Sequence, residues 1–220
     1  MDQETLILLR NFSSLVIELI TAIVGTLYYY KYKNSILRYF LIYLWFIVIC
    51  EFSAYIMREF FGIRNNALLF NLFYLISFTY LLNTYRLVIK DSVRKKIVKY
   101  SIGTYITLFT INGFYENYLI ESQTIPFIMA SSFLILSVIF YFVEILGTEK
   151  VLHTKKNLLF WISVGLLLFY AGSIPFRIAL NYYAKAGGFN FLFAINYLLI
   201  IILNLCFIIG FIWSNKKQLY

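Results

Sequence analysis

Charged side chains are scarce in this chain of 220 residues: they make up 13% of it, whereas 62% of the residues are apolar. In a soluble domain, about a quarter of the residues are charged and about half are apolar. The mean hydropathy is +0.80, and so little polar surface cannot cover a water-soluble globule. The composition therefore predicts a protein that is solvated by a lipid bilayer.

Residues that build catalytic and metal sites are also few, with one histidine and two cysteines. His153 is expected in a loop, so it cannot build a multi-histidine zinc site or a serine–histidine protease site in the membrane. Cys50 and Cys206 lie inside apolar runs and match no disulfide or metal-ligand spacing. Residues 189–213 contain no lysine for a retinal Schiff base, and no glycine-rich loop suits a phosphate. We therefore expect no enzymatic activity, no catalytic residue, no metal and no cofactor.

The sequence also shows no signal of a boundary between domains. The chain has two prolines and no low-complexity linker. Its first residues lack the basic start and the small-residue cleavage site of a signal peptide, so we expect the first apolar segment to remain in the mature protein. We predict a single integral membrane domain over residues 1–220.

What the chain does contain is a series of long apolar segments, close in length to the ~20 residues that cross ~30 Å of hydrocarbon. The seven segments cover residues 5–30, 36–61, 67–89, 97–114, 124–146, 158–180 and 189–213. The fourth is the shortest and the most polar. Continuously apolar segments of this length favour helices, because the strands of a membrane barrel are short and alternate in polarity. The sequence thus predicts an all-α, polytopic membrane protein with a bundle of seven transmembrane helices.

Basic residues gather on alternate connections, and this asymmetry predicts the orientation. One set of connections and the C-terminal tail carry most of them: Lys31, Lys33, Arg38, Arg86, Lys90, Arg94, Lys95, Lys96, Lys99, Lys150, Lys155, Lys156, Lys216 and Lys217. The positive-inside rule places these connections in the cytoplasm. We therefore expect a multi-pass protein of the plasma or inner membrane, with the N-terminus outside and the C-terminus in the cytoplasm. The net charge of +9 then reflects topology and contact with the lipid bilayer, with no nucleic-acid partner.

Two carboxylates inside apolar segments are the strongest functional indicators, because an ionisable group at membrane depth costs about 2.5–3.5 kcal/mol on insertion scales. Glu18 shares one helical face of the first segment with small or polar residues: Asn11, Ser14, Thr21 and Gly25. Glu51 lies in the second segment, and Tyr55 and Arg58 follow it on the same face. Both faces suit a functional site, in which each carboxylate needs a partner or a proton. The small residues of the first face also suit a helix-packing seam.

Further polar residues are predicted in the outer halves of other helices: Asn71, Asn112, Arg177 and Asn196. Together with Glu18, Glu51 and Arg58 they predict a ligand- or ion-binding pocket that opens to the outside. Arg58 and Arg177 near its rim would favour an anionic ligand or pair with the two carboxylates. An internal salt-bridge network that holds the bundle together is an equally good interpretation.

The stretch at residues 160–172, FWISVGLLLFYAG, resembles a run found in small, largely uncharacterised bacterial seven-helix membrane proteins. The resemblance implies a sensory or regulatory membrane component that works with a separate signalling protein. In gross topology the chain is also similar to heptahelical receptors.

Three functional hypotheses follow from these patterns. The first is a receptor-like sensor subunit that binds a small ligand in the outward-facing pocket and signals to a cytoplasmic protein through its basic loops. The second is a small transporter, or an ion or proton channel, that uses Glu18 and Glu51 and acts alone or as a homo-oligomer. The third is a membrane-disrupting or scaffold component of a larger system. The sequence ranks the sensor above the transporter. The first segment becomes apolar and aromatic after Gly25, so its polar face does not continue as a path to the other side of the membrane.

Overall fold

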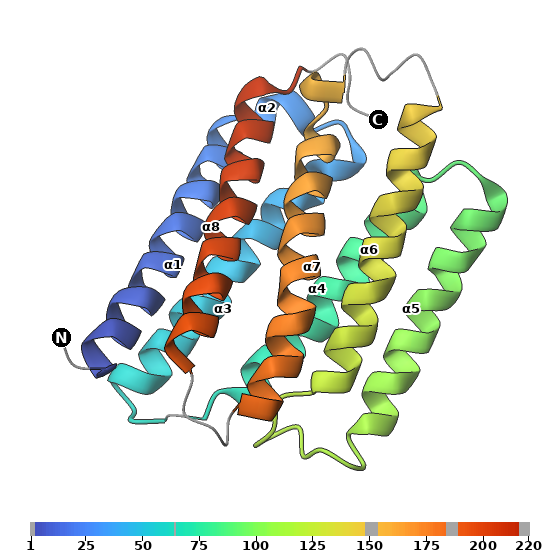
Figure 1. Cartoon of the computed structure of the whole chain (residues 1–220). Coiled ribbons are helices and arrows are strands. Elements are labelled where there is room, and N and C mark those ends of the chain that lie inside the picture. Colours follow the sequence, from blue (N-terminus) through green and yellow to red (C-terminus); the bar gives the residue numbers. More distant parts are fainter. Residues whose placement is uncertain (1–2, 64, 148–153, 184–188, 216–220) are drawn as a thin grey trace. The chain divides into compact units, whose positions relative to one another are not determined.

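The computed structural model describes residues 3–63, 65–147, 154–183 and 189–215, and among their side chains those of residues 14–63, 65–147, 154–179 and 194–215. Within these ranges every regular element is a helix, which confirms the all-α class (Figure 1). The long helices are α1 (Gln3–Leu27), α3 (Phe40–Glu59), α4 (Ala67–Val88), α5 (Ser92–Asn112), α6 (Thr124–Leu146), α7 (Leu158–Tyr183) and α8 (Phe189–Trp213). The short helix α2 (Tyr29–Tyr32) and the 3-10 turn η1 (Ile36–Tyr39) connect α1 to α3.

Each long helix falls on a predicted segment, and α6 and α8 have the predicted bounds. The largest difference is at α5, which begins at Ser92 rather than at residue 97. The carboxylate of Asp91 caps this helix, because it accepts a hydrogen bond from the backbone N–H of Arg94 at 2.8 Å. A hydropathy pattern misses the first turns of α5 because they are basic, although they are helical.

Five of the described helical segments are long and apolar enough to cross a bilayer: Ile36–Glu59, Ala67–Val88, Thr124–Leu146, Leu158–Ala179 and Ala194–Trp213. The described part of α1, Ser14–Leu27, is apolar but shorter, and α5 is not among the five. The apolar helices therefore support a membrane protein. The count of seven spans and the orientation of the termini stay predictions.

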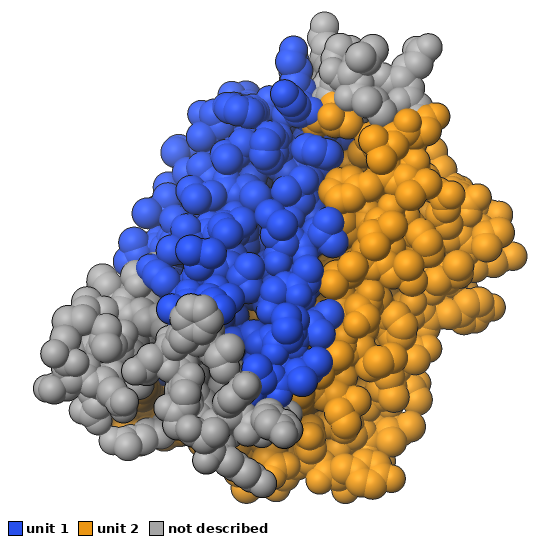
Figure 2. Space-filling model, in the orientation of Figure 1, with its two compact units in different colours: residues 1–55, 155–219 blue, residues 56–154, 220 orange. Residues whose placement is uncertain are grey.

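The helices group into two compact units, and each is described by itself (Figure 2). Unit 1 comprises residues 1–55 and 155–219, and therefore contains α1, α2, η1, most of α3, α7 and α8. Unit 2 comprises residues 56–154 with Tyr220, and contains α4, α5 and α6. The single membrane domain over residues 1–220 stays a prediction.

Within unit 1, α7 and α8 form an extended pair and lie side by side in Figure 1. Glycines permit the approach. A Cβ atom at Gly165 would lie 3.0 Å from the Cβ of Cys206 and 3.2 Å from the carbonyl oxygen of Leu203. A Cβ atom at Gly210 would lie 2.8 Å from the Cβ of Trp161. Small residues at such contacts let helix backbones approach closely, and this contact stabilises helix pairs in lipid.

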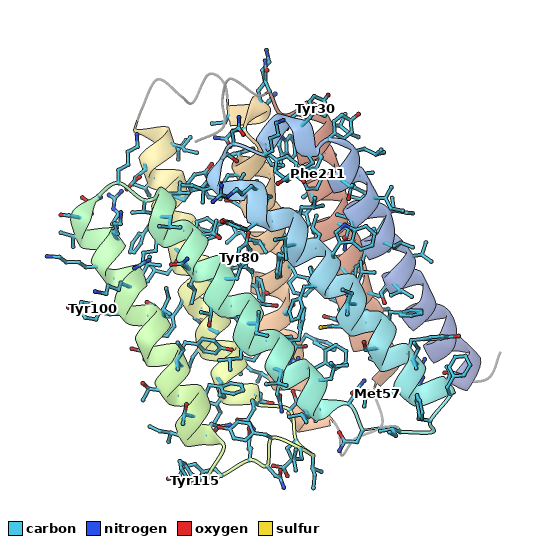
Figure 3. The ribbon with its side chains drawn as sticks, turned by 180° about the vertical axis from the view of Figure 1, so that it is seen from behind. Tyr30, Met57, Tyr80, Tyr100, Tyr115 and Phe211 are labelled. Carbon is cyan, nitrogen blue, oxygen red and sulfur yellow. The ribbon has the colours of Figure 1, made fainter. Side chains whose placement is uncertain are left out.

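The connection after α1 is tied to the C-terminal end of α8. The Tyr32 hydroxyl donates to the carbonyl oxygen of Gly25 at 2.6 Å. The Nζ of Lys31 donates to the carbonyl oxygens of Phe211 (labelled in Figure 3) and Ile212, at 2.9 Å each. These carbonyls belong to the last turn of α8, where the helix dipole favours a cation.

Aromatic rings from α4, α5 and α6 form the core of unit 2. The ring centroid of Phe78 lies 5.6 Å from that of Tyr105 and 5.5 Å from that of Phe127, both in edge-to-face geometry. Tyr85 meets Tyr141 at 6.0 Å in the same way. All five side chains are buried. Part of the high aromatic content therefore serves core packing, where such pairs add about 0.5–1.5 kcal/mol beyond their buried area.

Candidate functional site

Most of the polar face predicted for α1 is buried within the molecule, and Glu18 at its centre is partly buried. Ser14, Thr21 and Gly25 are buried, whereas Ile23 and Leu27 on the opposite side of the helix are exposed. The helical periodicity read from the sequence is thus confirmed for these positions. The side chain of Asn11, which belongs to the same predicted face, lies outside the described residues.

The register of α1 against α3 brings Glu18 and Glu51 together in unit 1. The two helices run in opposite directions (Figure 1), and a Cβ atom at Gly25 would lie 3.1 Å from Cδ1 of Leu44. Glu18 stands two turns before Gly25, and Glu51 stands two turns after Leu44. Because the two helices are antiparallel, these steps lead in the same direction. Both glutamates therefore lie about 10 Å from the Gly25–Leu44 contact, towards the same end of the helix pair and on the contacting faces. Their carboxyl groups are close enough to interact electrostatically.

The surroundings of this pair, which we call the Glu18–Glu51 pair, offer little compensation for charge. The Oε2 atom of Glu18 is buried and has no hydrogen-bond partner among the described residues. Over the same residues, no ion pair joins either carboxylate to a basic side chain. Both glutamates are partly buried, and a carboxylate oxygen that is buried without a partner is costly, so such a pair gains from a proton or a cation.

Arg58, one of the two arginines of the predicted pocket, has an acidic partner of its own. Arg58 forms an ion pair with its neighbour Glu59, with 2.9 Å between Nε and Oε1. Its Nη2 atom is buried and has no hydrogen-bond partner among the described residues. Arg58 belongs to unit 2, whereas Arg177 is a partly exposed residue of α7 in unit 1. The anion-binding rim proposed for these arginines stays a prediction.

Asn71, another predicted pocket residue, fastens the loop between α5 and α6. Its Nδ2 donates to the carbonyl oxygens of Tyr118 and Glu121, at 2.9 Å each. Its Oδ1 accepts from the backbone N–H of Gln123 at 3.1 Å. The side chain is buried, and its hydrogen-bonding groups are engaged by backbone.

Asn112, at the end of α5, belongs to the same network. Its Nδ2 donates to Oε1 of Gln123 at 2.6 Å and to Oε2 of Glu116 at 2.7 Å. Gln123 in turn donates through Nε2 to the carbonyl oxygen of Glu116 at 3.0 Å. The two asparagines thus share a network that holds the loop, and a ligand-binding role for them stays a prediction.

The sequence patterns did not single out the buried amides of Gln123, Asn157 and Asn204. Gln123 joins Asn71 to Asn112, yet it precedes an apolar segment and carries no signal of burial. Asn204 is buried in α8 and donates through Nδ2 to the carbonyl oxygen of Ile200 at 2.9 Å. The pattern that selected Asn196, an amide inside an apolar segment, would also have found Asn204. Asn196 itself is partly exposed.

Among the described residues, no three or more His, Cys, Asp or Glu side chains gather as ligands for a metal ion. Comparison of the chain with family models, curated proteins and solved structures finds no match. The resemblance to bacterial seven-helix proteins therefore stays a prediction. What the geometry itself provides is a carboxyl pair inside apolar helices.

Proposed function

We propose that this chain is a small membrane protein of the transporter or channel class, which binds a proton or a cation at the Glu18–Glu51 pair. The protein crosses the plasma or inner membrane seven times, with its N-terminus outside and its C-terminus in the cytoplasm. The observation that carries the proposal is the register of α1 against α3, which brings two carboxyl groups of apolar helices within electrostatic range.

The physical reason is the repulsion between two like charges in a medium of low dielectric constant. Two carboxylates that share such a site cannot both ionise without compensation. The described residues supply no basic side chain to either of them. A proton or a cation would provide this compensation. Its reversible binding inside the hydrocarbon layer is the step that a carrier or a channel requires.

The receptor-like sensor is the alternative, and it depends on a wider pocket. Asn71 and Asn112 are two residues of that pocket, and their amide groups already hold the α5–α6 loop. Binding a ligand there would require these hydrogen bonds to break, at a cost of about 1–3 kcal/mol for each buried group left unsatisfied. The Glu18–Glu51 pair needs no such rearrangement, so we rank transport above ligand sensing.

The decisive experiment measures ion movement. The purified protein is reconstituted into liposomes, and the decay of an imposed proton, sodium or potassium gradient is followed for the wild type, Glu18→Gln and Glu51→Gln. Glutamine has nearly the same shape but cannot carry the negative charge. We expect one gradient to decay through the wild type, and each substitution to return the rate to that of protein-free liposomes.

Glu59→Gln is the matched control, because Glu59 is an exposed carboxylate at the end of α3. It should leave the flux unchanged. Circular dichroism and gel filtration establish that every variant is folded. Folded, oriented wild-type protein that moves none of the three ions would contradict the proposal and favour the sensor with a cytoplasmic partner.

A further inference from the structure

The first turns of α5 present three lysines on one side of the helix. Lys95, Lys96 and Lys99 are exposed, and their helical spacing places them within an arc of about 100°. The buried side of the helix, which includes Val98 and Ser101, lies away from this arc. We call these three lysines the basic face of α5.

No acidic side chain of the described residues forms an ion pair with the basic face. Two acids near the start of α5 are engaged by backbone. Asp91 caps α5, and Glu144 accepts from the backbone N–H groups of Lys90 and Asp91 at 3.0–3.2 Å. Lysines three and four residues apart on a helix repel one another, so the basic face gains from an anion that the described residues do not supply.

An exposed apolar strip runs beside the lysines. Val93 is 62% exposed, Ile97 39% and Tyr100 71%, and Tyr100 projects outward from α5 in Figure 3. Tyrosine and aliphatic side chains next to lysines are typical of the boundary between hydrocarbon and headgroups. The start of α5 is also expected near this boundary, because it lies only four residues after Val88, where the candidate span of α4 ends.

We propose that the basic face of α5 binds the headgroups of anionic lipids in the surrounding bilayer. The cations meet the headgroup phosphates, while Ile97 and Tyr100 lie beside them at the boundary between headgroups and hydrocarbon. A basic cluster directly beside a membrane span is the arrangement that recruits anionic lipids, and each lysine contributes about fivefold to the association. An acidic cytoplasmic protein would use the same charges but leaves the apolar strip unexplained.

The test measures which lipids the full-length protein retains. Detergent-solubilised protein is mixed with equal amounts of phosphatidylglycerol and phosphatidylcholine, and bound lipids are counted by native mass spectrometry. We expect the wild type to retain phosphatidylglycerol preferentially, and less so as salt is added, because screening weakens exposed charges. The variant Lys95→Gln/Lys96→Gln/Lys99→Gln should lose about fivefold of the preference for each lysine removed.

The control variant Lys33→Gln/Lys155→Gln/Lys156→Gln removes three other exposed lysines, so its net charge is identical. It should keep the preference, and unchanged thermal unfolding establishes that both variants are folded. An equal loss in both variants would mean that total charge sets the preference, and would overturn the proposal. A wild type that retains the two lipids equally would also overturn the proposal. If that protein binds poly-glutamate, the basic face of α5 binds an acidic protein partner instead.

Discussion

At the scale of single residues, glycine decides how closely the helices of unit 1 approach. Gly210 of α8 faces the Cβ of Trp161 of α7, which cannot move without its backbone. At Gly103 of α5, by contrast, a Cβ would have no atom within 4 Å apart from those of its neighbours along the same helix. The same substitution should therefore have opposite effects at the two positions.

We expect Gly210→Ala to lower the free energy of unfolding by about 1–3 kcal/mol, because the added methyl group overpacks the α7–α8 contact. Gly103→Ala should instead raise it by about 0.5–1 kcal/mol, since alanine is the better helix former. Thermal unfolding in detergent, followed by circular dichroism, compares both variants with the wild type. Equal midpoints for the two variants would show that the α7–α8 contact is looser than described.

At the scale of elements, buried amides connect helices that the sequence leaves independent. Asn71 of α4 holds the backbone of the α5–α6 loop at Tyr118, Glu121 and Gln123. Asn66, at the start of α4, forms no capping hydrogen bond through its side chain. One asparagine thus has three backbone partners, while the other makes no comparable contact.

Asn71→Leu should destabilise unit 2 by about 1–3 kcal/mol, because it leaves buried backbone groups of the loop without partners. Hydrogen exchange at residues 118–123 should accelerate as well, since the N–H of Gln123 loses its acceptor. The control Asn66→Leu should change the stability of unit 2 by no more than about 0.5 kcal/mol. It should leave hydrogen exchange at residues 118–123 unaltered. Unaltered exchange in Asn71→Leu would argue against this role of the amide.

At the scale of the whole molecule, the proposed topology depends on a bilayer crossing by α5. Its first turns are basic, and it is not among the five candidate spans of the described residues. The proposed topology nevertheless requires it to cross, because the lysines at its start belong in the cytoplasm and the loop after it belongs outside.

Cysteine labelling in intact cells tests this crossing. With Cys50 and Cys206 replaced by serine, a membrane-impermeant maleimide should modify Phe114→Cys directly, since Phe114 is exposed after the end of α5. It should reach Ser92→Cys, at the start of the helix, only after permeabilisation. Labelling of both positions from the same side would mean that α5 does not cross and that the seven-span topology is wrong.

The sequence predicted the helices well, because their signals are local. The bounds of α6 and α8 follow from apolar runs alone, and the buried side of α1 follows from the spacing of Ser14, Thr21 and Gly25. The start of α5 was missed because a cap at Asp91, rather than hydropathy, begins that helix. The candidate site was predicted in part: Glu18 and Glu51 were selected by the cost of ionisable groups in lipid.

The sequence by itself therefore determined the all-helical class, the places of the helices and the apolar character that suits a bilayer. Only the tertiary structure decided which side chains meet. The register of α1 against α3 brings Glu18 within electrostatic range of Glu51, Arg58 pairs with Glu59, and Asn71 reaches Gln123 across more than fifty residues. Such contacts depend on which helices are neighbours and how far each slides along the other, and the periodicity within one helix carries no information about either.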